Sequence, residues 1–237
     1  MKGIKKMSIF VLKIIALISM VIDHSRYLQP MLDNDITKVI GRFSFVLFAF
    51  ILSEGIWHTK DRIKYLKRIV LFAALSQIPF MLFRSIVGRY VVLNILFTFA
   101  IAMILIILID KQKNEYIKIL IAMAGIVFSI LVPVDYGVYG IVLILIMYYT
   151  RKTKLFDFGF FIINIIYYGN KAEEINNDYK QLVPYMIGTF LTYIFLKLYN
   201  GKLGKKVKFL YLFYPIHLLV LFFIYYIWNN ISLISIG

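Results

Sequence analysis

Nine apolar runs follow one another along the chain, separated by short segments rich in charged and turn-forming residues. They lie at about residues 8–27, 39–57, 63–83, 91–109, 116–132, 137–150, 155–168, 181–199 and 208–228. An α-helix needs about 20 predominantly apolar residues to cross a bilayer core, and these runs lack the alternation of membrane β-strands. The pattern therefore predicts about nine transmembrane helices. The sixth and seventh runs are short, which predicts broken or tilted helices.

Composition supports the same class. The chain has 237 residues, of which 62% are hydrophobic, and its mean hydropathy is +0.83. A soluble core of this size cannot bury so much apolar surface, so much of it must face lipid. We predict an all-α, polytopic transmembrane helical bundle that forms a single membrane domain over residues 1–237. The first twenty residues resemble a signal peptide, but no small-residue cleavage site follows, so we expect them to be retained.

The charge distribution predicts an orientation. The formal net charge is +15, and 20 of the 27 Lys and Arg residues fall on one side if the nine spans alternate in direction. Cytoplasmic loops carry such an excess of cations. We therefore expect an N-in/C-out, multi-pass protein of the cell (plasma or inner) membrane. The basic charge then needs no nucleic-acid partner.

Two classes of chemistry are disfavoured. The chain contains no cysteine, which excludes disulfides, thiolate nucleophiles and cysteine-based zinc sites. Glu54 and His58 lie four residues apart on one predicted helix face, but two ligands do not make a metal site, and a local hydrogen bond explains them better. We expect no metal, and a catalytic mechanism would have to use histidine, carboxylates, tyrosine or hydroxyl groups.

The first apolar run ends in two ionisable residues, Asp23 and His24. Counted from Ile9, His24 lies roughly 22 Å along a helix, which is still within a bilayer core about 30 Å thick. Ionisable groups at such depth usually mark function. Adjacent helical residues point about 100° apart, so the two are not a ready-made pair. Asp23 can pair locally with Arg26, whereas His24 is the stronger functional candidate.

Further polar residues are predicted to lie inside or at the edge of the membrane. Arg42 lies at the height of Asp23 and can neutralise it or bind a substrate oxyanion, although an interfacial arginine that reaches towards water is an alternative. Near Pro215, which we expect to break the last helix, His217 lies close to the midplane. The remaining candidates are Gln77, Asn94, Asp135 and Tyr136. Helix–helix hydrogen bonds and a tight turn are the competing interpretations for these four.

Eight ordered blocks of the sequence resemble the TraX family. They are Leu12–His24, Ile40–Phe45, Glu54–Thr59, Lys64–Arg68, Leu75–Pro79, Leu93–Thr98, Val134–Gly140 and Phe213–Leu218. One departure is Val46, where the family pattern has proline. The family is named for a protein that acetylates the N-terminus of a conjugative pilin. It is also similar to the membrane acyltransferase-3 group, in which a histidine at the end of the first helix is the presumed catalytic base.

The resemblance implies an acetyltransferase that moves an acetyl group from acetyl-CoA to an amine, such as the N-terminus of a pilin-like peptide, or to a hydroxyl of a cell-envelope acceptor. His24 corresponds to the base, since histidine suits proton transfer near neutral pH. Asp23 or Asp135 would set its tautomer, and His217 would be a second acid/base or a liner. Three residues would hold the developing oxyanion: Arg42, Gln77 and Asn94. The backbone turn around Asp135 and Tyr136 would also receive substrate oxygen.

Acetyl-CoA is a cytosolic donor, whereas His24 is predicted to lie in the outer half of the membrane. The acetyl group would therefore have to reach His24 from the opposite side. The pantetheine arm would have to enter from a basic inner rim, for which the candidates are Lys60, Arg62, Lys64 and Arg68. Two other classes fit the polar residues. An ion- or proton-coupled transporter would use them as a path, and an inert partner would hold a peptide precursor in the lipid bilayer.

Overall fold

The structure is a computed structural model that describes residues 6–88, 90, 92–174, 178–205 and 209–234, with side chains up to Asn229. Within this part of the chain the fold is all-helical. The α-helices are α1 (Ile9–Ser25), α2 (Asp35–His58), α3 (Arg62–Ile86), α4 (Ile95–Asp110), α5 (Glu115–Leu131), α6 (Gly137–Tyr149), α7 (Leu155–Glu174), α8 (Tyr179–Leu198) and α9 (Leu210–Ile234). A short 3₁₀ helix, Pro30–Leu32, lies between α1 and α2.

Helices α2, α3, α4 and α5 begin at polar residues whose side chains cap free backbone amides. Asn34 and Thr37 form a capping box at the start of α2. The side chains of Asp61 and Asn114 accept hydrogen bonds from the first turns of α3 and α5. Each predicted apolar run corresponds to one helix, with boundaries a few residues apart. The apolar runs thus located the helices, and the capping residues lie at the polar boundaries between them.

Two expectations about the helices need correction. The seventh run was expected to be short, but α7 extends unbroken to Glu174 because the apolar face continues past the polar residues near its end. Pro215 was expected to break the last helix, yet α9 runs through it. Proline at this position is tolerated because it lies in the second turn, where it removes only one backbone hydrogen bond near the helix start.

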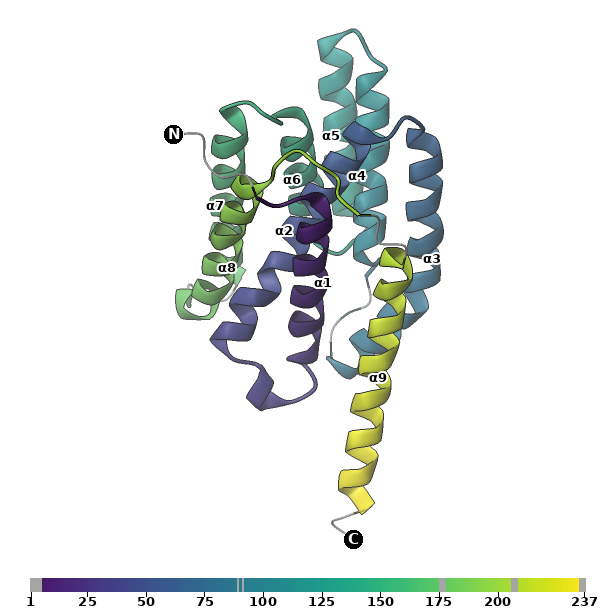
Figure 1. Cartoon of the computed structure of the whole chain (residues 1–237), viewed down its shortest axis with the longest axis vertical. Helices are drawn as coiled ribbons and strands as arrows, with labels where there is room; N and C mark the ends of the chain where they lie inside the picture. The colour runs from purple at the N-terminus through teal and green to yellow at the C-terminus, as the bar shows by residue number, and fades with distance from the viewer. Residues whose placement is uncertain (1–5, 89, 91, 175–177, 206–208, 235–237) are drawn as a thin grey trace.

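In the part of the chain that the structure describes, three helices are long and apolar enough to cross a membrane: α2, α3 and the Leu210–Asn229 part of α9. Successive helices run in alternating directions (Figure 1), so the connections at 59–61, 111–114 and 150–154 gather at one end of the bundle. We call this the inner end and the opposite one the outer end. The structure supports a helical membrane protein, while nine crossings and an N-in orientation stay predictions.

Helix α2 is the centre of the bundle and packs against α1, α4, α6 and α8. Glycines make two of these approaches possible. A Cβ atom at Gly41 would lie 2.4 Å from Oδ1 of Asp23 on α1, and one at Gly188 of α8 would lie 2.2 Å from the backbone oxygen of Val39. Small residues at such crossings let helix backbones approach closely. The polar residues of α1 and α2 are thereby brought to one level.

We expect Gly188→Ala to destabilise the protein by about 1–3 kcal/mol, because the added methyl group meets backbone that cannot move aside. Thermal unfolding of the detergent-purified protein would measure the change. The matched control is Gly169→Ala in α7, where an added Cβ meets nothing within 4 Å. Equal shifts in the two variants would contradict a tight α2–α8 crossing.

The absence of native cysteine allows the orientation to be tested with single cysteines. For an N-in protein, Met31→Cys, at a position 83% exposed in the outer connection, should react with a membrane-impermeant maleimide in whole cells. Lys113→Cys at the inner end should react only after the membrane is permeabilised. The reverse labelling pattern would invert the topology.

Candidate functional site

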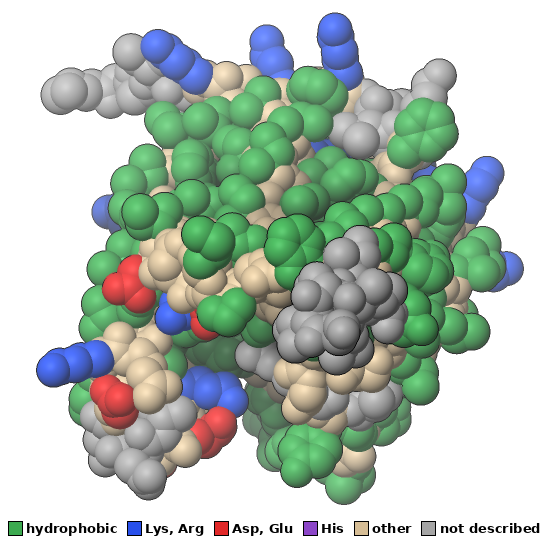
Figure 2. Space-filling view, turned by 90° about the horizontal axis from the view of Figure 1, so that it is seen from below, with side chains coloured by type: hydrophobic (Ala, Val, Ile, Leu, Met, Phe, Trp, Pro, Cys, Tyr) green, Lys and Arg blue, Asp and Glu red, His purple; other side chains and the backbone are tan. Residues whose placement is uncertain are grey.

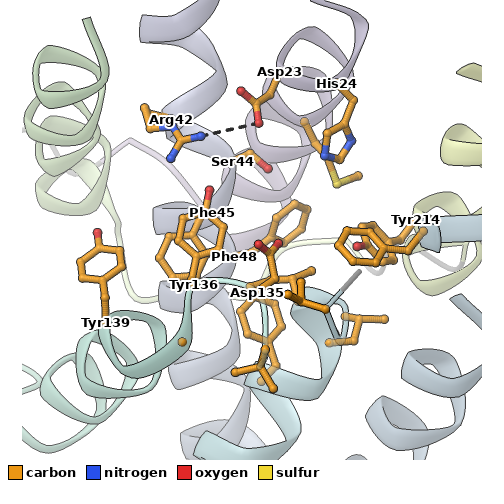
Figure 3. A pocket seen from close by; sticks show the side chains of 18 of the residues that line it. Asp23, His24, Arg42, Ser44, Phe45, Phe48, Asp135, Tyr136, Tyr139 and Tyr214 are labelled. Carbon is orange, nitrogen blue, oxygen red and sulfur yellow. Dashed lines mark ion pairs between the residues drawn. The ribbon is translucent and has the colours of Figure 1, made fainter. Parts of the chain in front are cut away.

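One large cavity of about 900 Å³ lies within the bundle and is lined by residues of every described helix except α5. Of the predicted site residues, Asp23, His24, Arg42, Asp135 and Tyr136 line it together. Figure 3 shows Asp23 and His24 projecting from α1 beside Arg42 of α2, with Asp135 and Tyr136 across the cavity. The structure therefore brings these residues together around one cavity, whereas the sequence predicted only their depth in the membrane.

His24 and His217 form a hydrogen-bonded pair, with 2.8 Å between Nδ1 of His24 and Nε2 of His217. Nδ1 of His217 lies 3.0 Å from the backbone oxygen of Phe213. A carbonyl oxygen only accepts, so Nδ1 of a neutral His217 donates and its Nε2 accepts. His24 must then donate through Nδ1, which leaves its Nε2 as the atom that can accept a proton. The hydrogen-bond partner of Nδ1 is thus His217, where a carboxylate from Asp23 or Asp135 was expected.

Asp23 is placed between two arginines. Nε of Arg26 donates to Oδ1 of Asp23 over 3.2 Å, and Nη2 of Arg42 lies 3.8 Å from Oδ2. Arg26 also donates through Nη1 to Asp33 over 2.7 Å and to the hydroxyl of Tyr185 over 3.1 Å. Both pairings anticipated for Asp23 are present, because α1 and α2 cross closely at Gly41. Charged groups in apolar surroundings need such partners.

Two tyrosine rings lie close to the guanidinium of Arg42. Its guanidinium carbon lies 5.7 Å from the ring centroid of Tyr136 and 5.0 Å from that of Tyr185. Tyr136 adopts a left-handed backbone conformation with φ of 62° and stacks on Phe45 with centroids 3.7 Å apart. A left-handed conformation is unfavourable for tyrosine and is often found at functional sites. It directs the Tyr136 ring into the cavity at the start of α6.

Several tyrosines of this region were not predicted as site residues. Tyr139 stacks on Tyr167 with centroids 3.9 Å apart, and both line the cavity with Tyr168 and Tyr185. Tyr136 precedes the first residue of α6, and Tyr139 lies in its first turn. Nothing local indicated that α7 and α8 would bring the other rings to them. We call Tyr136, Tyr139, Tyr167, Tyr168 and Tyr185 the tyrosine cluster.

Gln77 and Asn94, which the sequence predicts to bind substrate, do not line the cavity. Oε1 of Gln77 accepts hydrogen bonds from both the backbone and the side-chain nitrogen of Asn94, and its Nε2 donates to Val92 over 3.0 Å. Asn94 also donates to the backbone oxygen of Ala73 over 2.8 Å and caps α4 through Leu96. Their polar atoms are engaged in joining α3 to α4, so they are structural.

The four predicted donor-binding cations also lie outside the cavity lining. Arg62 is held at the inner end of α3 by Asp110, 2.5 Å away, and by the Tyr148 hydroxyl. Lys60 and Lys64 are exposed to solvent. Arg68 is the closest to the cavity, because its guanidinium carbon lies 5.9 Å from the ring of Tyr211, a lining residue.

Glu54 and His58 form the expected local hydrogen bond, but in a different way. Nδ1 of His58 bonds to the backbone oxygen of Glu54 over 2.8 Å. The Glu54 carboxylate instead accepts from Nε and Nη2 of Arg151, the latter over 2.8 Å. These bonds raise the pKa of Arg151 above its ordinary value. The group ties the inner end of α2 to the turn between α6 and α7.

The cavity extends over much of the height of the bundle. At the outer end it is lined by Lys171 and Glu174 of α7, and towards the inner end by Leu52 and Tyr65. Leu52 lies six residues before the end of α2, or about 9 Å. Figure 2 views the outer face and shows a recess bordered on one side by charged side chains. His24 thus lies in a cavity that approaches both ends.

Three helices of membrane length in a bundle that encloses a large cavity indicate a membrane protein. The chain belongs to the TraX protein family, which matches residues 8–225. It is 28% identical over 233 residues to a probable fimbrial assembly protein, FimC of serogroup H1, from Dichelobacter nodosus, covering 90% of this chain and 94% of that protein. No solved structure matches the chain.

If Asn94 is structural, Asn94→Ala should lower the free energy of unfolding by about 1–3 kcal/mol, because buried hydrogen-bonding groups of Gln77 and α4 lose their partners. Thermal or denaturant unfolding in detergent would measure this loss. Gln181→Ala, at an exposed position of α8 where the side chain bonds only to Asp178, should change stability little. An Asn94→Ala protein as stable as the wild type would restore the substrate-binding interpretation.

Proposed function

We propose that this protein is a membrane-embedded acetyltransferase that moves an acetyl group from acetyl-CoA to an amine, such as a peptide N-terminus, or to a hydroxyl. The observation that carries the proposal is the hydrogen-bonded series from Phe213 through His217 to His24. It favours a neutral His24 whose Nε2 can accept a proton, at the wall of a cavity large enough for small substrates.

In the proposed reaction, Nε2 of His24 takes a proton from the acceptor as its nitrogen or oxygen attacks the thioester carbonyl carbon. The carbon–sulfur bond then breaks, and the proton on His24 passes to the departing thiolate. The products are the acetylated acceptor and free CoA. Arg42 supplies positive charge in the same cavity, where it can stabilise negative charge that develops on the carbonyl oxygen. His217 acts as a positioning residue that fixes the tautomer of His24.

The donor would approach from the inner end, in agreement with the N-in topology that we propose. Leu52, Ile69 and Tyr65 give this end of the cavity a largely apolar lining that suits the pantetheine arm. Of the predicted basic rim, Lys60, Lys64 and Arg68 remain candidates for the CoA phosphates. Arg62 is the weakest of the four because Asp110 already neutralises it.

The acceptor would approach through the outer recess. The similarity to a probable fimbrial assembly protein supports a pilin-like peptide in this role, and a cell-envelope hydroxyl is the other acceptor that we consider. The site would then lie in the cell membrane, with the reaction taking place towards its outer side.

The proposal is tested by acetyl transfer from labelled acetyl-CoA to co-expressed pilin-like peptide, read as a mass increase of one acetyl group. His24→Ala should lower kcat by about 100-fold or more, since general bases contribute at least that much. Lys111→Ala, an inner-end change distant from the cavity lining, is the control and should retain activity. His217→Phe should reduce kcat less than His24→Ala, and His217→Gln should recover part of the loss because its amide oxygen can accept from His24.

Full activity of His24→Ala with the cognate acceptor would refute this mechanism. Proton flux through protein-containing liposomes without an acyl donor would favour a transporter. If the protein binds the peptide stably but shows no proton flux and releases no CoA, a non-catalytic assembly factor would be favoured.

A further inference from the structure

The two arginines in the cavity differ in how well their charges are satisfied. Arg26 is 3% exposed and donates hydrogen bonds to Asp23, Asp33, Tyr27 and Tyr185. The side chain of Arg42 is 16% exposed, and its Nε is buried without a hydrogen-bond partner among the described residues. Its Nη2 lies 3.8 Å from Asp23, which is beyond hydrogen-bond length. An arginine carries five N–H donors, and no described residue accepts a hydrogen bond from Arg42, so the terminal nitrogens of this cavity-lining side chain retain donors that a ligand can satisfy.

Neighbouring side chains and the backbone of α8 also hold the Arg42 side chain in place. The rings of Tyr136 and Tyr185 contact its guanidinium through their faces, which attract the cation without using its hydrogen-bond donors. A Cβ atom at Gly188 would lie 2.9 Å from Cβ of Arg42, so α8 packs closely on the stem of the arginine. The guanidinium is therefore oriented before any ligand arrives, which reduces the entropic cost of binding.

We infer that Arg42 binds an anionic group of the acceptor, and specifically a carboxylate side chain close to the N-terminus of an acceptor peptide. Arginine is suited to carboxylates because its parallel N–H groups match the two oxygens. The inference rests on the proposed acetyl transfer for its choice of ligand. Figure 3 shows Arg42 and His24 on either side of Asp23, so a peptide with its amine at His24 can reach Arg42 with a following residue.

The outer recess gives this acceptor a path. Lys171 and Glu174, whose side chains bond to each other over 2.6 Å, line the cavity at that end together with Asn170 and the tyrosine cluster. The cluster lines the same cavity as Arg42 and presents ring faces and hydroxyl groups, surroundings in which peptide backbone can be packed and hydrogen-bonded. An extended peptide advances about 3.3–3.6 Å per residue, so a few residues suffice to pass through this part of the cavity.

The test uses short synthetic peptides that differ at one position only. Each peptide carries Asp or Asn at its second, third or fourth residue, and a further set carries phosphoserine there. Initial rates of CoA release would be measured with purified wild-type protein. At one position Asp should raise kcat/KM by about tenfold or more over Asn, mainly through a lower KM, since a charge-assisted hydrogen bond contributes at least that much. A greater preference for phosphoserine would assign the site to phosphate and overturn the choice of carboxylate.

Arg42→Gln should abolish the preference for Asp, while Arg42→Lys should keep part of it because the charge remains. Lys38→Gln is the matched control: the residue lies one turn earlier on α2, carries the same charge and does not line the cavity. It should leave the preference unchanged. If Arg42→Gln instead lowers kcat equally for Asp and Asn peptides, Arg42 stabilises only the oxyanion and the inference is wrong.

Peptide affinity measured without acetyl-CoA separates this inference from the proposed activity. Tighter binding of the Asp peptide to wild-type protein than to Arg42→Gln, without acetyl transfer to any peptide, would support the anion site and refute the acetyltransferase. Equal transfer to Asp and Asn peptides by the wild type would support the acetyltransferase and refute the anion site.

Discussion

A carboxylate shared between two arginines in apolar surroundings is the interaction on which the rest of the site depends. Asp23 lies between Arg26 and Arg42, so none of the three charges is buried alone. The arrangement requires α1 and α2 to cross closely, which Gly41 permits, and it extends through Arg26 to Tyr185 of α8. The ion pairs of Asp23 therefore depend on the close packing of α1 against α2, and this packing in turn depends on the ion pairs that neutralise the buried charges.

The histidine pair links α1 to α9 through a hydrogen bond between the two rings. A backbone carbonyl of α9 fixes His217, and His217 fixes His24. A neutral series of this kind avoids placing another charge among the rings of Phe83 and Phe213, which contact the two histidines. Asp23, which points away from His24 by helical geometry, remains available to the arginines. The two functions of adjacent residues are therefore separated by about 100° of helix rotation.

The cavity would account for the difference in height between His24, the proposed base, and the cytosolic donor that we propose. It has a largely apolar part towards Leu52 and Tyr65, and a polar, tyrosine-rich part towards Lys171 and Glu174. These two environments suit two substrates that approach from opposite ends. Gln77 and Asn94, which the sequence suggested as part of the site, instead join α3 to α4 beside it. Their buried hydrogen bonds stabilise the wall rather than presenting groups to the cavity.

The sequence by itself determined the approximate positions of the helices, because runs of apolar residues are a local property, and its ordered motif blocks indicated the family. It also identified Asp23, His24, Arg42 and His217 as too polar for their predicted depth. Only the tertiary structure decided which of them touch. His24 and His217 are 193 residues apart, and the tyrosine cluster comes from three helices. Such partners follow from how helix faces pack against one another, which no local pattern in a single sequence specifies.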